Sequence, residues 1–200
     1  MKKIIKNSKK RILMVTMFAT FLSFANDASL FNIKNDAKKT ALTLYNVKQG
    51  NLLSVIDKNG VILYKETIQK PGIYNKGFDL TELPNGAYIF ELDKDLEISS
   101  IPFKVENSLV VFDKQNEKTI FKPFARVENN LVYVSKLALN EAPLKIEIFF
   151  EGFNESQLMY TETIKDIKTI ERIFKLEGLR LGSYTIVFYT EGKKFIKTIR

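Results

Sequence analysis

The sequence predicts an all-β protein in which two antiparallel β-sandwiches follow a cleaved signal peptide. Three observations predict this fold class: apolar residues alternate along short segments, turn signals recur about every 8 to 12 residues, and one segment of the chain repeats later. The 200 residues are 45% hydrophobic and 12% aromatic, which is enough apolar material for packed cores.

The composition excludes most familiar kinds of active site. The chain contains no His and no Cys, so it lacks the usual base at physiological pH, a thiolate nucleophile and the common ligands of zinc and copper. Disulfides cannot form either, and stability must come from apolar burial and sheet hydrogen bonds. We therefore expect no enzyme, no cofactor and no metal site.

The N-terminal 25 residues have the layout of a secretory signal peptide. Six basic residues precede an apolar run over Ile12–Phe24, and Ser23 and Ala25 put small side chains at the two positions that a signal peptidase must accommodate. This run is shorter than the roughly 20 residues that a transmembrane helix needs. We expect cleavage before Asn26, no membrane insertion after cleavage, and export to the periplasm, the cell surface or the medium. An uncleaved anchor is the alternative.

Most of the net positive charge belongs to this leader. Removing its six basic residues from the 31 in the chain leaves 25 against 23 acidic residues, so the net charge falls from +8 to +2. Nucleic-acid binding would need clustered Lys and Arg on the folded part. We therefore expect no nucleic-acid partner.

An internal repeat organises the rest of the chain. Residues 64–92 align without a gap with residues 160–188, at an offset of 96. Nine positions are identical: Tyr64/Tyr160, Glu66/Glu162, Thr67/Thr163, Ile68/Ile164, Phe78/Phe174, Leu80/Leu176, Leu83/Leu179, Gly86/Gly182 and Tyr88/Tyr184. We interpret this as two copies of one domain, over residues 26–112 and 113–200, each of a size that folds alone.

Local signals within each copy are those of strands and tight turns. Apolar and polar residues alternate around Tyr88 and around Tyr184. Asn59-Gly60 lies between two apolar runs and predicts a hairpin turn with positive φ at both central residues. The equivalent stretch of the second copy, Glu151–Ser156, is longer and polar, so we expect that loop to protrude. The most polar linker, 113–118, lies within the joining segment Glu106–Arg126.

A repeated motif predicts a structural corner between sheets. It comprises Leu83, Gly86 and Tyr88 in the first copy and Leu179, Gly182 and Tyr184 in the second. We expect the leucine to fill the core, the glycine to allow an unusual backbone conformation, and the tyrosine to hydrogen-bond back to the main chain of the corner.

The string Phe78–Phe90 resembles the immunoglobulin-like β-sandwich modules common in secreted proteins of Bacteroidetes. It is similar in particular to their carboxy-terminal sorting domains for type IX secretion, and Lys193–Arg200 resembles the basic closing strand of those domains. The resemblance implies two tandem immunoglobulin-like domains, and export through the outer membrane followed by release or surface attachment.

Two sets of carboxylates are candidates for chemistry. Asp93, Asp95 and Glu97 alternate near a turn and could bind a hard cation such as calcium, although a solvated hairpin turn is the favoured interpretation. Glu66 and Glu162 recur in both copies and could form a glycosidase pair. We favour instead an interaction of each glutamate with a neighbouring Lys or a backbone N–H.

Aromatic residues give the best candidate for a partner contact. In the segment after Ile148, alternation places Phe150 on the core face and Phe149 on the other face, so Phe149 and Phe153 are candidates for binding a protein or a glycan. Packing between the two domains is the alternative, and it is favoured.

These expectations describe an exported, non-catalytic binding or structural module whose partner is an unknown protein or glycan. One alternative makes the C-terminal copy a signal for secretion or surface attachment. A carbohydrate-active enzyme is the remaining alternative, and it requires Glu66 or Glu162 to lie in a cleft beside another carboxylate.

Overall fold

The computed structural model describes residues 30–36, 39–152, 155–178 and 182–200. The predicted signal peptide, residues 1–25, lies outside this part of the chain. Within the described residues, no helix is long and apolar enough to cross a membrane. Strands dominate throughout, accompanied by two single 3-10 turns, and the all-β prediction is confirmed.

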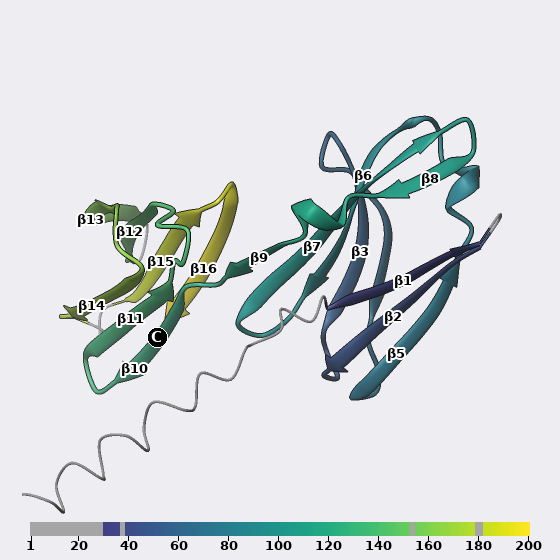
Figure 1. Cartoon of the computed structure of the whole chain (residues 1–200). Helices are drawn as coiled ribbons and strands as arrows, with labels where there is room; N and C mark the ends of the chain where they lie inside the picture. Colours follow the sequence, from purple (N-terminus) through teal and green to yellow (C-terminus); the bar gives the residue numbers. More distant parts are fainter. Residues whose placement is uncertain (1–29, 37–38, 153–154, 179–181) are drawn as a thin grey trace, which may run out of the picture. The chain divides into compact units, whose positions relative to one another are not determined.

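The first half of the chain forms two sheets. Their strand orders are β1-β2-β5 and β4-β3-β6-β7-β8, with β9 paired to β7 (Figure 1). The strands are β1 (Phe31–Asp36), β2 (Lys39–Val47), β3 (Leu52–Asp57), β4 (Ile62–Thr67), β5 (Gly72–Phe78), β6 (Gly86–Asp93), β7 (Glu97–Glu106), β8 (Leu109–Phe112) and β9 (Lys118–Phe121). We call these strands the N-terminal sandwich. Its 3-10 turns are η1 (Leu80–Glu82) and η2 (Lys114–Asn116).

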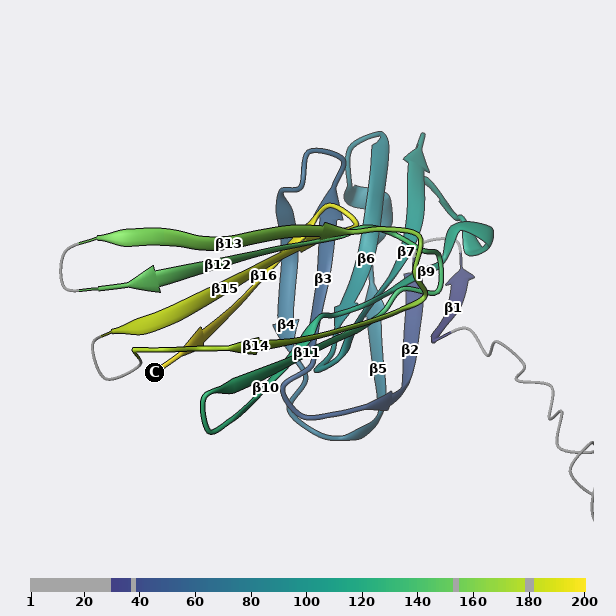
Figure 2. The same ribbon diagram turned by 90° about the vertical axis from the view of Figure 1, so that its left-hand side faces the viewer.

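The second half repeats this strand order in two further sheets, β10-β11-β14 and β13-β12-β15-β16 (Figure 2). Its strands are β10 (Phe124–Glu128), β11 (Leu131–Leu137), β12 (Leu144–Glu151), β13 (Ser156–Ile164), β14 (Thr169–Lys175), β15 (Ser183–Thr190) and β16 (Lys193–Ile199). We call these strands the C-terminal sandwich. Matching β1 to β7 with β10 to β16 gives the same neighbours in both halves.

Alternating apolar residues fill the space between the sheets of each sandwich. In the N-terminal sandwich, the ring of Phe78 on β5 meets that of Phe90 on β6 with 5.1 Å between centroids, so the two sheets contact through their inner faces. In the C-terminal sandwich, a buried cluster contains Val132 of β11, Ile146 of β12 and Phe188 of β15. Each such side chain stabilises the fold by about 1.5–3 kcal/mol when fully buried.

The Asn-Gly hairpin forms, with a turn that differs from the prediction. β3 and β4 pair antiparallel on either side of it. Gly60 has a positive φ of 83°, but Asn59 does not, because the Asp57 carboxylate accepts the backbone N–H groups of Asn59 and Val61 at 2.8 Å. The side chain of Asp57 therefore closes a three-residue loop in which only the glycine is left-handed.

Both corner tyrosines are buried and hydrogen-bonded to the main chain. The hydroxyl of Tyr88 donates to the carbonyl oxygen of Pro84 at 2.7 Å, and that of Tyr184 donates to the carbonyl oxygen of Glu177 at 2.7 Å. Each ring fills the core while its polar end satisfies a carbonyl of the segment before the strand.

The expectations for the other corner residues need correction. Leu83 is only half-buried, and Leu80, three residues earlier in η1, fills the core instead at 4% exposure. Neither Gly86 nor Gly182 has a positive φ, so an unusual backbone conformation is not their role. Leu179 lies outside the described residues.

The sheet of the N-terminal sandwich extends beyond residue 112, the predicted end of the first domain, into the segment that joins the two halves. Residues Glu97 to Ser100 of β7 pair with Phe121 to Lys118 of β9, so the ladder of the N-terminal sandwich continues through Phe121. The polar stretch before β9 forms η2, which begins where the Asp113 side chain accepts from Asn116. β10 then starts the other sheet pair at Phe124.

Candidate functional site

A cluster of tyrosine, glutamate and a basic residue recurs at one side of each sandwich, and we call it the inter-sheet cluster. In the N-terminal sandwich, Glu66 of β4 accepts hydrogen bonds from the Tyr64 hydroxyl and from the Lys76 ammonium of β5. β4 and β5 belong to different sheets. The charged contact therefore joins the two layers of the sandwich.

The C-terminal sandwich has the same arrangement with a stronger base. Arg172 of β14 donates from Nε and Nη2 to the Glu162 carboxylate of β13, at 2.8–3.2 Å. The Tyr160 hydroxyl donates to the same carboxylate at 3.1 Å. A bidentate guanidinium contact is better oriented than a single ammonium contact. The basic partner differs between copies, so the search for identical residues missed it.

A β-bulge aims the tyrosine of each inter-sheet cluster. Along β4, Leu63 is an extra residue opposite the step from Val55 to Ile56, and along β13, Met159 is the extra residue at the equivalent place. Leu63 and Met159 are 96 positions apart, like the tyrosines that follow them. Bulges re-aim side chains and discourage pairing of a strand edge with another chain.

Electrostatics make both glutamates poor proton donors. The hydrogen bond from Lys76, followed by that from Tyr64, lowers the pKa of Glu66 from its ordinary 4.5 to about 2. Arg172 likewise lowers the pKa of Glu162. A glycosidase general acid needs a pKa raised toward neutrality. The structure thus engages each glutamate with a cation, as the favoured interpretation of the sequence expected, and gives neither the environment of a general acid.

The lowered pKa of Glu66 makes a testable prediction. A carboxyl whose folded pKa lies below its unfolded value adds stability above pH 4.5, and this contribution is lost as the pH falls toward 2. Because Lys76 and Glu66 are 35% and 32% exposed, solvent screening reduces the contribution to about 1 kcal/mol. Glu66→Gln should lower the urea unfolding free energy by that amount at pH 7, and the difference should shrink as the pH falls toward 2 and vanish below it.

Glu82→Gln is the matched control, because Glu82 is an exposed glutamate in η1. We expect it to leave the unfolding free energy unchanged at both pH values. An equal effect of the two substitutions at pH 7 would contradict a stabilising role for the Glu66 contact.

The three alternating carboxylates near the β6–β7 turn each meet a lysine. Lys122 donates to Asp93, Lys48 lies 3.6 Å from Asp95, and Lys94 lies 2.8 Å from Glu97. In the part of the chain that the structure describes, no group of three or more acidic residues is placed to hold a metal ion. The lysines supply the countercharge that a calcium ion would otherwise bring.

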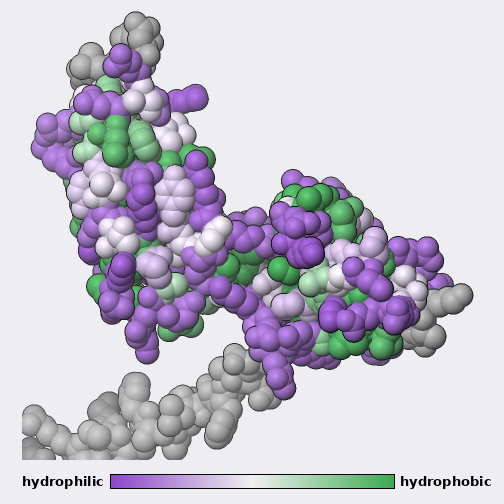
Figure 3. Space-filling view, turned by 90° about the horizontal axis from the view of Figure 1, so that it is seen from above, coloured by the Kyte–Doolittle hydropathy of each residue, from purple (hydrophilic) through white to green (hydrophobic). Residues whose placement is uncertain are grey.

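The aromatic candidates for partner contact are only partly described. Phe149 on β12 is half-buried, and Phe153 lies outside the described residues. Phe150 turns inward, where its ring contacts that of Tyr184 at 5.1 Å. On the neighbouring edge strand β13, Leu158 and Met159 are more exposed, at 49% and 54%. The space-filling view shows hydrophobic residues in small groups among hydrophilic ones (Figure 3).

A buried ion pair closes one end of the C-terminal sandwich. The Lys136 side chain is 0% exposed and that of Glu191, in the β15–β16 turn, is 5% exposed, with 3.5 Å between Nζ and Oε1. Asn140 and Lys118 also donate to Glu191, at 3.0 and 2.9 Å. Burial lowers the pKa of Lys136. The sequence carries no local signal of this pair, because its members come from β11 and a distant turn.

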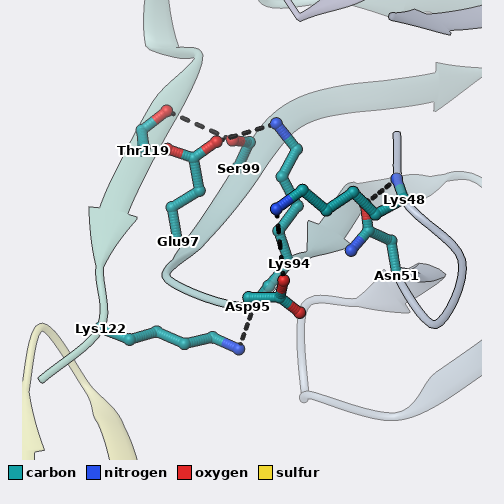
Figure 4. Close-up of polar contacts among 8 residues, drawn as sticks. All are labelled: Lys48, Asn51, Lys94, Asp95, Glu97, Ser99, Thr119 and Lys122. Atoms are coloured by element: carbon teal, nitrogen blue, oxygen red, sulfur yellow. Dashed lines mark hydrogen bonds and ion pairs between the residues drawn. The ribbon is translucent and has the colours of Figure 1, made fainter. Parts of the chain in front are cut away.

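The corresponding end of the N-terminal sandwich holds an open polar pocket of about 280 Å³ (Figure 4). The loop between β2 and β3 forms one wall, and the turn between β6 and β7 forms the other. Its polar lining includes Lys48, Asn51, Lys94, Asp95 and Glu97. We take this pocket as a candidate ligand site in the described part of the chain, and sequence reasoning identified only its carboxylates.

No family model and no curated protein matches the chain. Solved structures do match, among them a chain titled "Biofilm associated protein - BSP domain", with 13% identity and a TM-score of 0.25. The match covers 84% of this chain and 28% of that one, so the chain spans little more than a quarter of that protein. A TM-score this low carries no argument about function.

Proposed function

We propose that the chain is an exported, non-catalytic binding or structural module that acts through the surfaces of two tandem β-sandwiches. The observation that carries this proposal is the repeated inter-sheet cluster. The two glutamates most suited to catalysis, Glu66 and Glu162, are each bound to a cation from the facing sheet. Their role is to hold the layers of each sandwich together, which leaves loops, edges and faces for binding a protein or a glycan.

The strand ladders support a division into two domains of the immunoglobulin-like kind, joined after Phe121. β9 pairs with β7, and β10 pairs with β11. The only residues between β9 and β10 are Lys122 and Pro123. A C-terminal fragment for experiments should therefore begin at residue 123, since one beginning at 113 would carry a strand of the first sheet.

Export is the part of the proposal that a single experiment tests. The chain is expressed with its first 25 residues in a Gram-negative host. Cell fractionation then gives the location of the protein, and mass spectrometry gives its intact mass. We expect mature protein that begins at Asn26, in the periplasm, on the surface or in the medium. Protein that retains Met1 and stays in the cytoplasm would overturn the proposal.

A second candidate function is a signal for secretion or surface attachment in the C-terminal sandwich, as in the type IX sorting domains of Bacteroidetes. The feature that favours it is β16, an edge strand whose exposed side chains include Lys194 and Lys197. Residues 123–200 fused behind a periplasmic reporter in a type IX host separate the two functions. Transfer of the reporter to the surface or medium supports a sorting signal, whereas retention in the periplasm supports a module alone.

A further inference from the structure

The pocket of the N-terminal sandwich contains a buried hydrogen-bond donor without an acceptor. Asn51 is 2% exposed, and its side-chain nitrogen Nδ2 has no partner among the described residues. In Figure 4 this nitrogen points toward the turn that carries Lys94 and Asp95. A buried donor left unpaired is unfavourable and uncommon in native proteins.

The surrounding contacts fix the orientation of the Asn51 amide. Its backbone N–H donates to the Lys48 carbonyl at 3.1 Å, and its own carbonyl accepts from the N–H of Ile68 at 2.8 Å. The side-chain oxygen Oδ1 accepts from the backbone N–H of Lys48 at 2.8 Å. Because only an oxygen can accept that N–H, the amide cannot flip, and Nδ2 stays directed away from the Lys48 N–H, toward the β6–β7 turn.

The charges that line the pocket are balanced. Lys94 pairs with Glu97 at 2.8 Å, and Lys48 pairs loosely with Asp95 at 3.6 Å, with side chains 74% and 68% exposed. Two cations and two anions give no net attraction for an ion. They do present donors and acceptors side by side, which is the pattern that hydroxyl groups satisfy, since each hydroxyl both donates and accepts.

The C-terminal sandwich provides a comparison for the unpaired donor. There the loop between β11 and β12 contributes Asn140, whose Nδ2 donates to Glu191 at 3.0 Å. Glu191 and Asp95 are 96 positions apart, yet Asp95 pairs with Lys48 and leaves Asn51 without an acceptor. The asparagine amide therefore has a carboxylate acceptor in the C-terminal sandwich, and the asparagine amide of the N-terminal sandwich has none among the described residues.

The geometry points to a neutral saccharide as the ligand of this pocket. A ring hydroxyl accepts from Asn51 Nδ2 and donates to Asp95 or Glu97, while Leu96, an exposed residue of the pocket lining, supports the apolar side of the ring. The volume of about 280 Å³ lies just under the range of roughly 300–1,000 Å³ for ligand pockets. It suits one sugar ring. Because Nδ2 is buried in the unliganded chain, we expect the exposed Lys48 side chain, which reaches toward Asp95 in Figure 4, to move aside on binding.

The inference rests on the proposed function only in assuming a binding module, and its test does not depend on export. The mature chain, residues 26–200, is labelled with ¹⁵N and titrated with glucose, galactose, mannose and N-acetylglucosamine. We expect saturable shifts of the Asn51 side-chain amide and of the backbone amides of 94–97 with at least one sugar. Sodium acetate at the same concentration serves as the anion probe and should produce none.

Asn51→Asp is the decisive variant, because the carboxylate keeps an acceptor for Lys48 N–H and removes the donor. We expect it to weaken sugar binding about tenfold or more. Asn59→Asp, in the exposed turn at the other end of β3, is the matched control and should bind like the parent. Circular dichroism checks that both variants fold. If Asn51→Asp does not fold, Asp95→Asn provides a second test.

Three outcomes would overturn the inference. The first is the absence of saturable shifts with all four sugars, and the second is saturation with acetate but with no sugar. The third is unchanged sugar binding in folded Asn51→Asp. If the protein is exported as proposed but binds no sugar, the inference fails and the proposed function stands. If the protein binds sugar but stays in the cytoplasm, the inference stands and the proposed export fails.

Discussion

Glu191→Gln is expected to lower the free energy of unfolding of the C-terminal sandwich by about 3 kcal/mol. Glu191 is the countercharge of Lys136, whose side chain is 0% exposed. The only other contact of the Lys136 ammonium that the structure records is the Leu137 carbonyl, at 3.4 Å. Glutamine therefore leaves a buried ammonium without a negative partner. Urea unfolding followed by circular dichroism, on the whole mature chain, measures the change.

Electrostatics agree with this expectation. Burial raises the pKa of Glu191, but hydrogen bonds from Lys118 and Asn140 together with the positive charges of Lys118 and Lys136 outweigh it and hold the pKa below its ordinary value. Glu191 is therefore charged at neutral pH, and the substitution removes a full negative charge from the interior.

Two further variants test the assignment of this effect to the buried pair. Lys118→Gln removes a cation that is 50% exposed, and we expect it to cost less than about 1 kcal/mol. The double variant Lys136→Met/Glu191→Gln removes both buried charges and should recover most of the lost stability. Equal effects of Glu191→Gln and Lys118→Gln, or no recovery in the double variant, would refute the buried pair as the cause.

Gly182→Ala should destabilise the C-terminal sandwich by about 3 kcal/mol. A Cβ at this position would lie 2.3 Å from the Glu151 carbonyl oxygen and 2.8 Å from Cζ of Phe150. That carbonyl belongs to β12 at the point where Glu151 pairs with Ser183 of β15. The backbone oxygen cannot move without displacing the strand pair, so the added methyl group strains the corner.

Gly86→Ala is the control that the repeat itself supplies. Gly86 is 96 positions before Gly182, but a Cβ there would meet only the Tyr88 side chain, at 3.5 Å or more. We expect a change within about 1 kcal/mol, because alanine also reduces the conformational entropy of the unfolded chain. Thermal unfolding of both variants measures the contrast, and equal loss of stability would show that close approach to β12 is not the reason for glycine.

Local patterns determined the fold class of this protein. Alternation of apolar residues requires strands with one buried face, Asn59-Gly60 requires a turn, and the repeat around Tyr88 and Tyr184 requires two similar units. Each of these signals depends on residues that are close in sequence. For that reason the all-β architecture, the hairpin and the favoured interpretation of Glu66 could be predicted, although the geometry of the turn was not.

Only the tertiary structure decided which residues act together. At the corner, Leu80 fills the core because η1 directs its side chain inward. Glycine is required at position 182 because the backbone of β12 lies too close for a Cβ. The bases beside Glu66 and Glu162 come from the facing sheet, and the partner of Lys136 comes from a turn 55 positions away. The unpaired amide of Asn51 also depends on two distant loops. Such contacts form when sheets stack. They depend on distance in space, and the spacing of residues along the chain does not determine that distance.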